Sequence, residues 1–225
     1  MRGPVPHGSL SLPARLALLS RDGDGAEIPG TAQVVRAGAL VELAVRGLLV
    51  DEDGIATPAD MDSDSGDPVL DGLLELVRES GPHGWRTWVT LHSRVTRDVV
   101  REQLAAAGYL RGRRKWTLGI FPSVAYESAA PGEAAALRLR QDVRGILDGR
   151  VPAEEVSERD VATTVLAAAA GLSALSPSDG PEDMARVEDL IERGGEVAPV
   201  LREVAHEVRA TVGGRASAAA GTMPR

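Results

Sequence analysis

Three arginines share one face of a predicted helix, an arrangement that suits the binding of an anion. At about 100° per residue, Arg94, Arg97 and Arg101 lie within roughly 60° of one another on that helix. Arg97 and Arg101 are like charges at i,i+4, and the row lies near the helix N-terminus, where the dipole disfavours cations. A bound anion would relieve both penalties. Alternatively, Asp98, Glu102 or acids from elsewhere in the chain neutralise the row.

Two further basic features are candidates for binding. Arg36 is a lone charge near the start of the most apolar predicted helix, where free amides of the first turn would help to hold an anion. The alternative is a surface residue where the helix emerges. The basic cluster at 111–115 leads into Trp116, a pattern typical of a nucleic-acid wing or a membrane-interface element. A solvated turn with one core tryptophan is the other reading.

Patterns that would indicate an enzyme are missing from the sequence. The four histidines are scattered without metal-ligand spacing, and there is no cysteine. Neither a nucleophile elbow nor a phosphate-binding glycine loop occurs. We therefore expect no enzymatic activity, no metal and no cofactor.

The composition of the 225 residues indicates one soluble domain with a helical core. Aromatic residues make up only 3%, so Leu, Val and Ala must fill the core, which favours close-packed helices over an aromatic-rich β fold. The net charge of −8 makes nucleic acid an unfavourable partner. Without a long apolar run or a signal peptide, we expect a cytoplasmic protein.

The pattern of apolar residues and helix breakers predicts a mainly α fold, a single compact helical domain around a central bundle with one β-hairpin. We expect a flexible leader at 1–11, the helical domain at 12–212 and a disordered tail at 213–225. An acidic loop is predicted at 51–67 and the hairpin at about 113–127. The predicted helices are 12–19, 34–50, one that starts at Pro68 after the cap Asp67, 95–107, 132–148, 153–157, 158–174, 181–193 and 196–212.

Three stretches resemble the Golgi phosphoprotein family, whose members bind phosphatidylinositol 4-phosphate and occur in bacteria as well. VVRAGALVELAVRGLLV (34–50) is similar to the family's arginine-containing apolar helix, and DSGDPVLDGLLELV (64–77) to its "TGDxLLDEAL" motif. SRVTRDVVREQLAAAGYLRGRRKWTLGIFP (93–122) resembles its arginine-bearing helix and hairpin. Heavy use of Ala, Gly and Arg fits a bacterial, actinobacterial-type member.

The resemblance implies a non-enzymatic protein attached peripherally to the inner face of the plasma membrane, with an anionic lipid headgroup as ligand. Carried over by position, the headgroup pocket consists of Arg36, Arg94 and Arg97, with Arg101 as a further candidate. The family's pocket tryptophan falls near Glu27, so the chain departs from the family there. The resemblance identifies neither the lipid nor a protein client.

The resemblance also implies that the hairpin mediates self-association or membrane contact, through its apolar residues Trp116, Leu118, Ile120 and Phe121. Two alternatives stay open. A helix, a turn and a basic hairpin are also typical of a winged-helix DNA-binding regulator. A scaffold without a ligand, its arginines paired internally, is the other.

Overall fold

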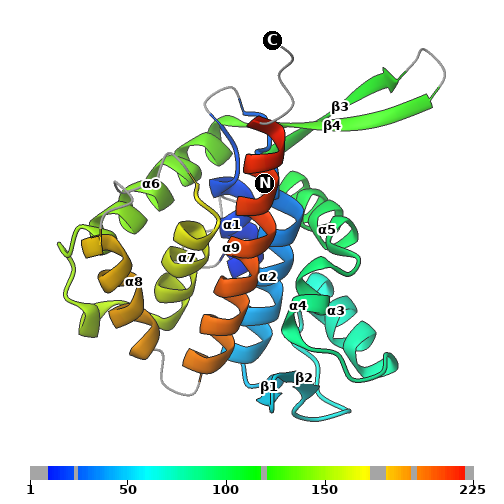
Figure 1. The fold of residues 1–225 in the computed structure, drawn as a ribbon. Coiled ribbons are helices and arrows are strands. Elements are labelled where there is room, and N and C mark those ends of the chain that lie inside the picture. The colour runs from blue at the N-terminus through cyan, green and yellow to red at the C-terminus, as the bar shows by residue number, and fades with distance from the viewer. Residues whose placement is uncertain (1–9, 23–24, 118–120, 173–180, 194–196, 221–225) are drawn as a thin grey trace.

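A computed structural model describes residues 10–22, 25–117, 121–172, 181–193 and 197–220, and confirms the predicted mainly helical fold (Figure 1). Two separate two-stranded antiparallel hairpins accompany the helices in this part of the chain. The elements are α1 (Leu12–Leu19), α2 (Thr31–Val45), β1 (Leu49–Glu52), β2 (Ile55–Pro58), α3 (Pro68–Glu79), α4 (Trp85–Thr90), α5 (Ser93–Ala106), β3 (Leu110–Thr117), β4 (Phe121–Ser128), α6 (Ala130–Leu147), a 3₁₀ turn (Ala153–Glu155), α7 (Glu158–Ala169), α8 (Pro181–Glu192) and α9 (Ala198–Ala220).

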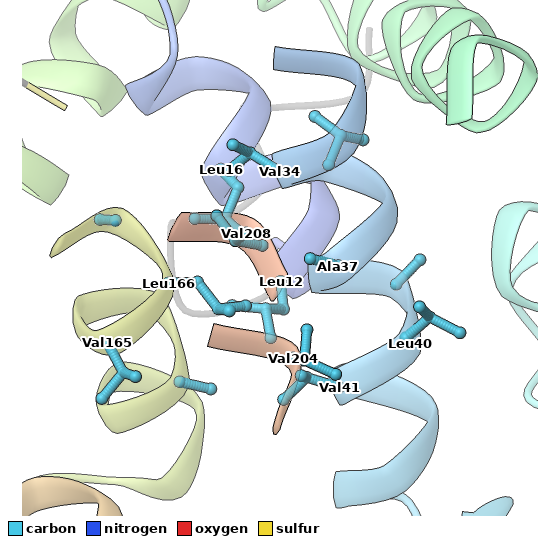
Figure 2. Packing of buried hydrophobic residues seen from close by; sticks show 14 of the residues in the cluster. Leu12, Leu16, Val34, Ala37, Leu40, Val41, Val165, Leu166, Val204 and Val208 are labelled. Carbon is cyan, nitrogen blue, oxygen red and sulfur yellow. The ribbon is translucent and has the colours of Figure 1, made fainter. Parts of the chain in front are cut away.

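Helix α2 runs through the centre of the molecule and is enclosed on all sides. It is buried from Thr31 to Ala44 and contacts α1, α4, α5, α7 and α9. Figure 2 shows its Ala37 and Val41 among side chains of α1, α7 and α9. This burial confirms the prediction from its apolar sequence. The helix ends at Val45 rather than at 50, because the chain turns at Gly47 (φ 69°) into β1.

Close packing of α1 on α2 depends on a glycine. A Cβ atom on Gly38 would lie 2.6 Å from Cδ1 of Leu16 and 3.2 Å from the Pro13 backbone. The small residue therefore lets the two helix backbones approach, as the composition led us to expect.

Helix α3 begins as its capping residues predict. The side chain of Asp67 accepts a hydrogen bond from the amide of Val69 at 2.9 Å, and Pro68 occupies the first helical turn. The apolar face of α3 is buried, including Leu70 and Leu74. This helix is thereby fixed at the edge of the core beside α5.

The structure corrects the prediction of an acidic loop at 51–67, because its first part belongs to a β-hairpin. Strands β1 and β2 pair antiparallel, with Asp53 (φ 52°) and Gly54 (φ 82°) in the tight turn between them. Asp-Gly with two positive φ angles is a strong signal for such a turn.

Helix α4 was also not predicted, since six residues hold too little periodicity to be recognised.

The hairpin predicted at about 113–127 is confirmed and is longer than expected, but it is the second of two hairpins in the described residues, where one was predicted. Strands β3 and β4 pair from Leu110 opposite Ser128 to Thr117 opposite Phe121. Figure 1 shows this hairpin projecting away from the helices.

Near the C-terminus, α9 continues past its predicted end at 212 to Ala220, through an alanine-rich stretch that favours a helix.

The start of α6 yields a stability prediction. A Cβ atom on Gly132 would lie 2.1 Å from the carbonyl oxygen of Tyr109, which accepts a hydrogen bond from the Ala129 amide at 3.0 Å. Gly132→Ala should therefore lower the free energy of unfolding by about 2 kcal/mol or more, because backbone must move. Urea denaturation measures this.

Gly145→Ala in the same helix is the matched control. Nothing lies within 4 Å of a Cβ atom there. It should leave stability unchanged or raise it by up to about 1 kcal/mol through helix propensity. Equal effects of the two substitutions would show that the contact of Gly132 with Tyr109 is unimportant.

Candidate functional site

Helix α5 positions the predicted row of arginines. Ser93, Thr96, Val100 and Leu104 form its buried face, and the arginines lie beside that face. The helix begins after His92, which has a left-handed backbone (φ 53°) and provides no side-chain cap. The first turn of α5 is therefore a local source of positive potential.

Arg101 is held in an internal ion pair. Its Nε and Nη2 donate to the two carboxylate oxygens of Glu27, at 2.6 and 2.5 Å, and its Nη1 donates to Asp98 at 3.0 Å. Its guanidinium also lies 5.9 Å from the ring centre of Tyr126. Burial opposes the charge, but the hydrogen bonds and attraction of Glu27 and Asp98 outweigh it and raise the pKa of Arg101. For Arg101 the structure therefore confirms the alternative that an acid from elsewhere in the chain, here Glu27, neutralises the arginine.

Glu27 also faces Arg21, a residue that the sequence analysis did not single out. The Arg21 side chain is buried, and its Nη1 lies 3.5 Å from Oε1 of Glu27. Its Nε donates to Oγ of Ser128 at 3.1 Å, and its Nη2 donates to the carbonyl of Tyr126. Burial lowers the pKa of Arg21, and the attraction of Glu27 works against that. Glu27 thus neutralises two cations, and no local sequence signal indicates this.

Arg97 and Arg94 form fewer internal ion pairs than Arg101 does. Both Nε and Nη2 of Arg97 donate to a single oxygen of Asp98, at 3.0 and 2.8 Å, and the Asp98 side chain is 52% exposed. Within the described part of the chain, exposed Arg94 has no hydrogen bond or ion pair. These two cations remain accessible to a ligand.

Arg36 lies inside the protein, only 2% exposed, beneath the start of α5. Its Nε donates to the carbonyl oxygen of Trp88 at 3.0 Å, and its Nη1 to Oγ1 of Thr96 at 2.7 Å. Its Nη2 is buried without a partner among the described residues. Burial lowers the pKa of Arg36 to about 10, so the side chain stays charged at neutral pH. The reading of Arg36 as an emerging surface residue is therefore wrong.

The structure brings the three predicted pocket residues close in the fold without placing them in one cavity. Thr96, the hydrogen-bond partner of Arg36, lies between Arg94 and Arg97 in sequence. A cavity of about 330 Å³ is lined by Arg36, but its other walls come from α3 and the start of α5, and neither Arg94 nor Arg97 lines it. The three arginines therefore do not converge on one cavity: Arg36 is buried, Arg97 is partly buried and Arg94 is exposed.

The hairpin residues predicted to make contacts are only partly described. Trp116 in β3 lies opposite Pro122, and Phe121 in β4 lies opposite Thr117, at the end of the ladder. Leu118 and Ile120 lie outside the described residues. Arg113, from the basic cluster, pairs across the strands with Glu127 at 3.1 Å.

Two further features of the described residues bear on function. None of their helices has both the length and the apolar character that crossing a bilayer requires. No three histidine or acidic side chains among them gather in a group able to hold a metal ion.

Comparison with known proteins gives one family. The model of the family described as Golgi phosphoprotein 3 (GPP34) matches residues 12–211. No curated protein matches the chain. The match spans helices α1 to α8 and most of α9, including the buried helix α2 and the arginine-bearing helix α5.

The ion pairs of Glu27 predict a stability effect. Glu27→Gln would leave Arg21 and Arg101 without their shared carboxylate, and should lower the free energy of unfolding by on the order of 3 kcal/mol. Asp98→Asn is the control, because its exposed pairs should contribute less than about 1 kcal/mol. Urea denaturation compares the two. If both substitutions lowered the free energy of unfolding equally, Glu27 would contribute no more to stability than the exposed Asp98 does.

Proposed function

The chain belongs to the Golgi phosphoprotein 3 (GPP34) family, and on this basis we propose that it is a non-enzymatic peripheral membrane adaptor that binds an anionic lipid headgroup. The proposed headgroup residues are Arg94 and Arg97 at the surface, with Arg36 beneath them. We place the protein at the cytoplasmic face of the plasma membrane, with phosphoinositides as the lipid class by family resemblance.

The arrangement of charge around the first turns of α5 is the observation that supports this proposal. Arg94 is unpaired among the described residues, and Arg97 has only the exposed Asp98 as a partner. Both lie near the positive end of the helix dipole, and Arg36 adds a buried charge without a carboxylate. A phosphate accepted here would gain charge-assisted hydrogen bonds and relieve repulsion among the cations.

Arg101 has no place in this proposed site. Glu27 and Asp98 already accept from all three of its nitrogen positions. A headgroup would have to displace Glu27, which would leave Arg21 without its carboxylate. The proposed ligand therefore contacts the N-terminal part of the arginine row.

The winged-helix alternative has less support. The chain carries a net charge of −8, and Arg113 of the hairpin is paired with Glu127. A protein that binds DNA through phosphate contacts normally presents an excess of basic charge. Family membership favours the adaptor over the DNA-binding regulator.

The hairpin gives a prediction about self-association. Strands β3 and β4 form a sheet of two strands, so each has an edge without a neighbour in it, and such edges tend to be covered. We propose that a second copy covers this hairpin, and that Trp116→Asp weakens the self-association. Analytical ultracentrifugation over a concentration range measures this. A monomer at all concentrations, both before and after the substitution, would contradict the proposal.

The headgroup site gives a prediction about membrane binding. Arg97→Ala should weaken binding to phosphatidylcholine vesicles containing phosphatidylinositol 4-phosphate about tenfold or more, because charge-assisted hydrogen bonds to the phosphate are lost. Vesicles with phosphatidylglycerol or cardiolipin instead, tested at two salt concentrations, identify the lipid. Co-sedimentation measures the bound fraction, and thermal stability should stay nearly constant.

Arg150→Ala is the matched control for the vesicle experiment. Arg150 is likewise an arginine paired with a nearby aspartate, Asp148, at 2.8 Å, and its side chain is more exposed than that of Arg97. Its substitution changes the net charge equally and should leave vesicle binding almost unchanged. Equal weakening by both substitutions would show that only overall charge matters, and would overturn the proposed site.

A further inference from the structure

A mostly aliphatic groove lies between helices α3 and α5. Its volume is about 330 Å³, near the lower end for small-molecule pockets. Val95 at its wall is 60% exposed, so apolar surface faces solvent there. Its lining includes Arg36 of α2, Gly72 and Leu73 of α3, and Val95 and Val99 of α5.

Arg36 is the one permanently charged residue among those that line this groove. Its two engaged nitrogens donate to neutral oxygens, a carbonyl and a hydroxyl, and Nη2 has no acceptor among the described residues. A buried cation is costly unless an anion balances it. The groove therefore combines apolar walls with one buried positive charge that no carboxylate among the described residues balances.

From this combination we infer that the groove binds a long-chain carboxylate, with its hydrocarbon along α3 and α5 and its anionic end paired with Arg36. A single cation with one free donor atom matches a monoanion. A dianionic phosphate monoester would need further cations, and Arg94 and Arg97 do not line the groove.

Access to Nη2 requires a small rearrangement. The atom is buried, so neighbouring side chains must move before a carboxylate can reach it. Contact without intervening water then strengthens the ion pair.

Gly72 offers a way to fill the groove without harming the fold. It lies within α3 and is exposed, and nothing lies within 4 Å of a Cβ atom placed on it. Gly72→Leu would extend a side chain into the groove while improving helix propensity. Gly145→Leu is the matched control, since Gly145 is a helical glycine of α6 with equally open space and lies outside the groove.

The test is calorimetric titration of the full chain with decanoate and with decanol. The unsubstituted protein should bind decanoate about tenfold more tightly than decanol, because only the carboxylate pairs with Arg36. Gly72→Leu should weaken decanoate binding about tenfold or more, while Gly145→Leu should not change it. Arg36→Met should remove the preference for decanoate over decanol.

Two results would overturn the inference. One is the absence of decanoate binding to the unsubstituted protein, and the other is equal binding by the Gly72→Leu and Gly145→Leu variants. The groove shares Arg36 with the proposed headgroup site but does not depend on it. Arg97→Ala should leave decanoate binding unchanged, so a failure of vesicle binding and a failure of the groove are told apart.

Discussion

Complete burial of helix α2 is the constraint on which the rest of the structure depends, because every polar group on it must find a partner inside the protein. Glu42 finds several: it accepts from the Leu12 amide at 3.0 Å, from Arg46 at 2.8 Å and from Arg159 at 2.6 Å. Burial works to raise the pKa of Glu42, but these bonds outweigh it and lower that pKa. Its contribution to stability is therefore present above the ordinary glutamate pKa and is lost as the pH falls through the lowered value.

Arg36, two turns earlier on the same helix, has a different environment. Its partners are neutral, and its charge is balanced by no carboxylate among the described residues. Glu42 thus ties α2 to α1 and α7 and serves the fold, whereas Arg36 leaves an electrostatic imbalance beside α5. Stability alone does not favour an unbalanced buried cation, so the imbalance points to a ligand. Both proposals above start from this asymmetry between two charges on one helix.

Much of the fold could be predicted because its signals are local. The aspartate and proline at the start of α3 cap that helix in the structure as the sequence indicates, and the apolar run of α2 is buried. The elements that were missed are short. Helix α4 spans six residues, and the β1–β2 turn at Asp53 and Gly54 lies within a run of acids that resembles a loop. The Asp-Gly pair is a signal for a tight turn, but the acidic composition around it is typical of a loop.

The sequence by itself determined which arginines share a helix face and that one arginine lies on a buried helix, since both follow from a period of 3.6 residues. Tertiary structure alone decided which of these charges are free. Glu27 is 74 positions from Arg101 in sequence, and it takes that arginine out of the candidate site while also pairing with Arg21. Local spacing carries no information about such pairs, because an ion pair depends on distance in space. The same holds for the groove, whose walls come from helices that only the folded chain places together.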